Sequence, residues 1–103
     1  MVRIESSGDV TFELHDPGAR QVLLVGAFDS WHEQRLPMRR DERGTWRLTV
    51  QAGPGCHLFR YLIDGRRWRL DEAAHGVHRT ADGQVKSRCW RPPLTQDPDA
   101  IAA

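Results

Sequence analysis

The sequence of 103 residues contains only two cysteines, Cys56 and Cys89. Two thiols are too few for a disulfide framework or for a four-cysteine zinc site, so neither kind of stabilising cross-link is expected. One bridge between strands is an alternative, but two free thiols in a reducing compartment are the interpretation that we favour. A chain of this length can bury a modest core of its own, and a single domain is expected.

Long apolar runs are also missing. No stretch approaches the roughly 20 apolar residues that a transmembrane helix needs. The first ten residues, MVRIESSGDV, contain no apolar segment of signal-peptide length. The sequence therefore predicts a cytoplasmic protein with no membrane partner.

An excess of charge of one sign is absent as well. The 15 basic and 14 acidic side chains leave a formal net charge of +1, whereas a general binder of polyanions has a strong basic excess. Two segments, RRWRL and RCWR, do interleave arginine with tryptophan, a combination that suits single-stranded nucleic acid. Because the overall charge is balanced, we expect no nucleic-acid partner.

Helical periodicity is nearly absent, and alternation with a period of two takes its place. The segment TWRLTV places Trp46 in register with Leu48 and Val50, so Trp46 is expected in the core. The run QVLLV is apolar on both faces, as is typical of a strand between two layers. The expected strands cover residues 10–14, 20–28, 45–50, 57–63, 66–70 and 84–90.

Turn signals separate these segments. Asp64-Gly65 is a strong hairpin signal, and the stretch 71–81 is weakly patterned and expected to be a loop. Six to eight short strands at this spacing predict an all-β fold, an antiparallel β-sandwich over residues 1–91. The proline-rich, polar segment 92–103 is expected to be a flexible C-terminal tail.

Side chains that could support catalysis or bind a metal ion are present, but not in a convincing arrangement. His75 and His78 lack a nearby cysteine or acidic set that would complete a metal site. Asp71 and Glu72 are adjacent, so in an extended chain they point in different directions, whereas glycosidases need two carboxylates across a cleft. Phosphate-loop, dinucleotide and nucleophile-elbow motifs are missing too. We therefore expect no catalytic residues, no metal and no cofactor.

Several short motifs follow one another between residues 9 and 91. One strand ends in Gly26, Phe28 and Trp31, the step LPM follows, and the segment GCHLFRYLIDGRRW begins at Gly55 and ends at Trp68. In order and spacing these motifs resemble the glycogen-binding or isoamylase N-terminal (early set) domain, carbohydrate-binding module family 48. The glycogen-binding domain of the AMP-activated protein kinase β subunit is one member of that family.

The resemblance implies an immunoglobulin-like (early set) β-sandwich that binds α-1,4-glucans such as glycogen, starch or maltooligosaccharides. It also implies a sugar platform made by Trp31, Arg60 and Trp68. The threonine and asparagine that usually contact sugar hydroxyls correspond to Gln84 and Lys86, both of which can donate hydrogen bonds. An α-glucan polysaccharide or oligosaccharide is thus the expected partner, and a glycogen-metabolism enzyme or another protein is a second one.

Without the resemblance, the residues leave the positions of Trp31 and Trp68 open. A sugar ring has an apolar face, which suits a flat aromatic surface flanked by a few polar groups. Arg60 alternates with Phe59 and Tyr61, so its side chain is expected outside the core. Trp31, in the loop after a buried strand, is either a core plug or an exposed platform. Trp68, beside a polar hairpin, is either exposed or packed on the sheet edge.

A protein-interaction module with the same fold is the alternative function, because a shared fold does not establish a shared function. Trp90 keeps this alternative open, since it either caps the sandwich or belongs to a partner interface. The feature that separates the two functions is whether Trp31, Arg60 and Trp68 converge on one exposed patch.

Overall fold

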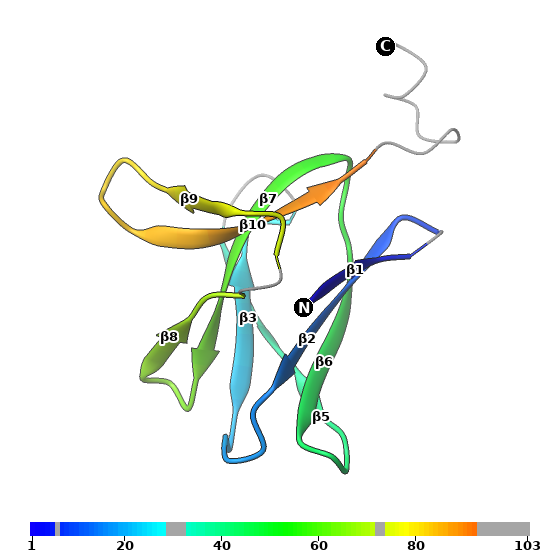
Figure 1. Cartoon of the computed structure of the whole chain (residues 1–103), viewed down its shortest axis with the longest axis vertical. Coiled ribbons are helices and arrows are strands. Elements are labelled where there is room, and N and C mark those ends of the chain that lie inside the picture. The colour runs from blue at the N-terminus through cyan, green and yellow to red at the C-terminus, as the bar shows by residue number, and fades with distance from the viewer. Residues whose placement is uncertain (6, 29–32, 72–73, 93–103) are drawn as a thin grey trace.

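The computed structural model describes residues 1–5, 7–28, 33–71 and 74–92. These residues form an all-β structure of ten strands in two antiparallel sheets (Figure 1). The described part of the chain contains no helix with the length and apolar character needed to cross a membrane.

The strands divide between a four-stranded sheet and a six-stranded sheet. The smaller sheet has the order β1 (Val2–Ile4), β2 (Asp9–His15), β6 (Thr45–Gln51), β5 (Arg39–Arg40). The larger has the order β4 (Gln34–Pro37), β3 (Val22–Gly26), β7 (Gly55–Ile63), β10 (Val85–Arg91), β9 (Val77–Arg79). The short β8 (Arg67–Arg69) also pairs with β7, beyond the part of β7 that β10 covers.

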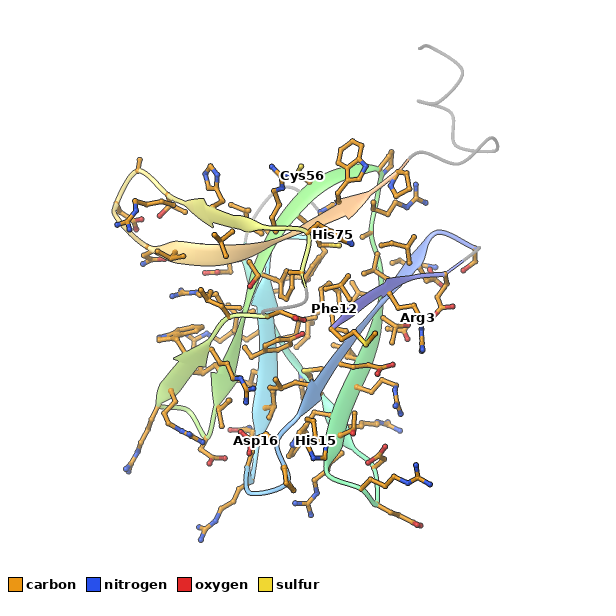
Figure 2. All side chains as sticks on the ribbon, in the orientation of Figure 1. Arg3, Phe12, His15, Asp16, Cys56 and His75 are labelled. Atoms are coloured by element: carbon orange, nitrogen blue, oxygen red, sulfur yellow. The ribbon has the colours of Figure 1, made fainter. Side chains whose placement is uncertain are left out.

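The core lies between the two sheets, and Phe12 of β2 is at its centre (Figure 2). The Phe12 ring packs edge-on against Phe59 of β7, with ring centroids 4.8 Å apart, and lies 5.2 Å from the ring of Phe28. Trp46 of β6 is buried as its alternation predicts, and its indole N–H donates to the Asp16 carbonyl at 2.9 Å. Aromatic contacts from both sheets therefore hold the two layers together.

A small cluster of buried polar groups connects β7 with β10. The Tyr61 hydroxyl donates to Asp71 Oδ2 at 2.7 Å, and the Asp71 backbone N–H donates to Ser87 Oγ at 2.7 Å. Burial and the adjacent Asp71 carboxylate both raise the pKa of Tyr61, so its hydroxyl keeps its proton. The side chain and the backbone of Asp71 thereby connect β7 with β10 inside the fold.

The predicted antiparallel β-sandwich is confirmed, with more strands than the six to eight expected. The additional strands, β1, β4, β5 and β9, have two to four residues each, and every one lies at a sheet edge. The expected loop 71–81 is wrong for Val77–Arg79, which forms β9 on the open edge of β10. The hairpin at Asp64-Gly65 is confirmed, with φ of 54° and 70°.

Candidate functional site

The larger sheet carries a polar and aromatic surface around strand β7, on the side that faces away from the core. Phe59, Tyr61 and Ile63 point into the core and are fully buried, so the alternate residues Arg60 and Leu62 lie on the opposite, outer face. The prediction that Arg60 points out of the core is thus confirmed.

The Asp64-Gly65 hairpin brings Trp68 onto this outer face. In the β7–β8 ladder Trp68 lies opposite Leu62, and directly opposite residues of an antiparallel pair share one face. The Asp64 carboxylate accepts hydrogen bonds from the backbone N–H groups of Arg20 and Gln21, at 2.7 and 2.9 Å. These bonds attach the hairpin to the start of β3 and hold it in place.

Arg60 and Trp68 form a stacked pair. The guanidinium carbon of Arg60 lies 3.8 Å from the centroid of the Trp68 ring, within the range of a cation–π interaction. Trp68 nevertheless remains 44% exposed, so part of the indole is available to a ligand. Arg60 Nε is buried and has no hydrogen-bond partner in the described residues, so stacking carries much of the placement of this side chain.

Gln84 and Lys86 complete the candidate site. Arg60 Nη2 donates to Gln84 Oε1 at 3.3 Å. The β7–β10 ladder pairs Phe59 with Ser87, and one further step of the same register brings Lys86 beside Arg60. Lys86 Nζ forms an ion pair with Glu33 Oε1 at 3.3 Å. The outer face thus brings two cationic side chains, an aromatic ring and an amide close together.

The turn before β10 is built to hold Gln84. Asp82 Oδ1 accepts hydrogen bonds from the Thr80 hydroxyl and, at 3.4 Å, from the Gln84 backbone N–H. The Thr80 N–H donates to the Gln84 carbonyl at 2.8 Å. The hydrogen bond from the Thr80 hydroxyl has the largest lowering effect on the pKa of Asp82, and the bond from the Gln84 N–H lowers it further. Backbone donors at Gln21 and then Arg20 lower the pKa of Asp64 in the same way.

We expect the domain to lose thermal stability as the pH falls below about 4, since unfolded aspartates titrate near 3.9. Carboxylates whose pKa is lowered by folding stabilise the fold above their unfolded pKa. That contribution disappears as the pH falls through their folded pKa. Unfolding followed by circular dichroism across this range measures the effect, and Asp64→Asn should make the decline shallower. A melting temperature that does not change with pH would contradict the prediction.

Four of the five predicted sugar-binding residues, Arg60, Trp68, Gln84 and Lys86, lie together on the outer face. The fifth, Trp31, lies outside the described residues. Glu33 was not predicted, because its contact with Lys86 joins segments far apart in sequence and neither segment signals it.

Side chains suited to binding a metal ion do not assemble in the described part of the chain. It contains no cluster of three or more histidine, cysteine or acidic side chains that could hold a metal ion. Cys56 and Cys89 are both free, one exposed and one buried, and burial raises the pKa of Cys89 to about 11. His57 serves the fold, because its Nε2 lies 2.7 Å from the Gly53 carbonyl oxygen.

Comparison with curated proteins shows related sequences in proteins that include 1,4-alpha-glucan branching enzymes. The chain is 45% identical over 53 residues to the chloroplastic protein FLOURY ENDOSPERM 6 of Oryza sativa subsp. japonica, covering 52% of this chain and 10% of that protein. It is 39% identical over 67 residues to a 1,4-alpha-glucan branching enzyme, GlgB 1, of Xanthomonas axonopodis pv. citri (strain 306), covering 63% of this chain and 9% of the enzyme. The chain therefore spans about a tenth of the length of these relatives.

Solved structures share the fold. The catalytic module of the pneumococcal virulence factor SpuA, described as glycogen-degrading, superposes with a TM-score of 0.67 at 19% identity, covering 87% of this chain and 16% of that one. A pullulanase from Anoxybacillus sp. LM18-11, complexed with maltotetraose, superposes with a TM-score of 0.64 at 24% identity, covering 84% and 13%.

The sequence model of carbohydrate-binding module 48, the isoamylase N-terminal domain, matches residues 2–74. This match extends over most of the described sandwich, including the β7–β8 hairpin, and it confirms the resemblance seen in the motifs. The chain belongs to carbohydrate-binding module family 48, which has an immunoglobulin-like early-set fold.

Proposed function

We propose that the outer face of the larger sheet is an α-1,4-glucan site, formed by Trp68, Arg60, Gln84 and Lys86, with Trp31 as a second stacking residue. The observation that carries the proposal is the stack of the Arg60 guanidinium on a tryptophan that remains 44% exposed. A tryptophan fixed in this way is a flat apolar surface that needs no reordering when a sugar ring stacks on it.

The polar neighbours suit the edges of such a ring. The Gln84 amide and the Lys86 ammonium supply donors on one side of the tryptophan, and Arg60 supplies further N–H groups between them. Sugar hydroxyls can replace the contacts that these groups now make with each other and with Glu33. The ion pair with Glu33 is partly exposed, so breaking it costs little.

We also propose that this domain binds its glucan without transforming it. Its relatives are mostly much longer proteins, including branching enzymes, and the chain corresponds to about a tenth of them. A glycogen-metabolism enzyme is therefore the protein partner that we propose, with the domain holding that enzyme on its polymeric substrate. Linkage of a weak sugar site to another site raises the overall affinity through effective concentration.

Titration of the protein with maltoheptaose tests the proposal, with binding measured by isothermal calorimetry and by tryptophan fluorescence. We expect saturable binding of maltoheptaose and of β-cyclodextrin, and none of cellohexaose, whose β-1,4 links give a straighter chain. No binding of either α-glucan up to millimolar concentration would overturn the proposal. The alternative of a protein-interaction module would then be tested by capture of a protein partner.

A further inference from the structure

A second exposed tryptophan, Trp90, lies on the same face of the sheet as the proposed site. Alternate residues of a strand share a face, so Lys86, Arg88 and Trp90 of β10 point to one side, and Gln84 precedes them in the same alternation. Trp90 is 46% exposed, much like Trp68. It does not cap the sandwich, because the inward residues of β10 are Ser87, Cys89 and Arg91.

The register of β7 and β10 fixes the relation between the two tryptophans. Trp90 lies opposite Cys56 of β7, and Trp68 lies opposite Leu62 of the same strand. The two tryptophans are therefore six residues apart along β7, or about 20 Å for an extended strand. Arg60 and Lys86 lie between them.

The backbone at Trp90 is held by hydrogen bonds, and its ring is not enclosed. The Trp90 backbone N–H donates to His75 Nδ1 at 2.8 Å, and the neighbouring Arg88 exchanges backbone hydrogen bonds with His75 and Gly76. Its cross-strand neighbour Cys56 is small and exposed (Figure 2). Trp90 thus has a fixed backbone position at the end of the outer face, and its ring is open to a ligand.

We infer that Trp90 is a further stacking position, beyond Trp68 and Trp31, for the same α-1,4-glucan chain, several sugar units away from Trp68. This inference rests on the proposed function. The surface between the tryptophans carries Arg60, Lys86 and the exposed Arg88, which are suited to hydroxyl groups. Because this surface is continuous with the proposed Trp68 site on the same face of the sheet, the same sugar chain is the occupant that we assign to it.

A Trp90→Ala variant tests the inference by comparing the binding of short and long α-1,4-glucans. We expect maltotriose, which reaches only the Trp68 end, to bind the variant as it binds the unaltered protein. Maltodecaose should bind about three- to tenfold more weakly, the range expected for the loss of one aromatic contact. Isothermal titration with both sugars measures the difference, and Val77→Ala, which removes an exposed apolar side chain from the neighbouring strand β9, is the matched control.

The outcomes distinguish this inference from the function on which it rests. Unchanged maltodecaose binding in Trp90→Ala would overturn the inference and leave the Trp68 site intact, and the Trp90 surface would then belong to a protein partner. An equal loss of affinity for maltotriose and maltodecaose would also overturn the inference, since Trp90 would then affect binding through the fold. Failure of the unaltered protein to bind either sugar would overturn the glucan function itself. The exposed position of Trp90 favours normal folding of the variant, which its melting temperature checks.

Discussion

Replacing Trp68 by alanine is expected to weaken maltoheptaose binding by roughly thirtyfold or more, the loss of about 2 kcal/mol that is typical of an aromatic anchor. Two effects combine in this variant. The sugar loses the exposed part of the indole, and Arg60 loses the ring that holds its guanidinium, at 3.8 Å from the ring centroid. Calorimetric titration measures the change, and a melting temperature near that of the unaltered protein shows that folding is preserved.

Trp68→Phe is the control that divides these effects. Phenylalanine keeps a flat ring under the Arg60 guanidinium but offers a smaller surface, so we expect an intermediate loss of affinity. A Trp68→Ala variant that is folded and binds maltoheptaose as tightly as the unaltered protein would contradict the assignment of this residue. An equally large loss with phenylalanine would mean that the indole itself is required.

The main strands could be predicted because their own residues specify which face is buried. In β7 one face carries Phe59, Tyr61 and Ile63, and the other face carries a charge, so the strand and the orientation of Arg60 follow from local sequence. The edge strands could not be predicted in this way. The three exposed residues of β9 form a strand because β10 leaves a row of backbone groups unpaired beside them, which is a property of the assembled sheet.

In the candidate site, too, some features follow from local sequence and others depend on how the strands pair. Alternation placed Arg60 outside the core, whereas the residues around the Asp64-Gly65 hairpin left Trp68 either exposed or packed on the sheet edge. The grouping of Trp68 with Arg60 was implied only by the family resemblance, and the β7–β8 ladder accounts for it. Alternation also puts Trp90 in register with Lys86, a signal that was available in the sequence. The pairing of Gln84 with Arg60 depends on the register between β7 and β10, and the local sequence of either strand does not determine that register.

Replacing Phe12 by alanine is expected to destabilise the domain by about 3–5 kcal/mol, the range for truncating a fully buried phenylalanine. Phe12 is 0% exposed and contacts the rings of both Phe28 and Phe59, so the cavity would open between the two sheets. Domains of this size are stable by about 5–15 kcal/mol, so a large share of the total would be lost. Urea unfolding at 25 °C measures the difference, and Phe12→Leu, which fills more of the space, should cost less.

This variant also tests whether the sugar site depends on the core beyond folding. Phe59, which Phe12 contacts, is the neighbour of Arg60 in β7, but the two side chains lie on opposite faces of the strand. Ladder hydrogen bonds to β3 and β10 keep β7 in register, so the outer face should retain its geometry in the molecules that remain folded. At a temperature where Phe12→Ala is still folded, we expect an unchanged dissociation constant for maltoheptaose. A weakened constant there would show that the packing of the two layers sets the positions of Arg60 and Trp68, and that the outer face is not an independent platform.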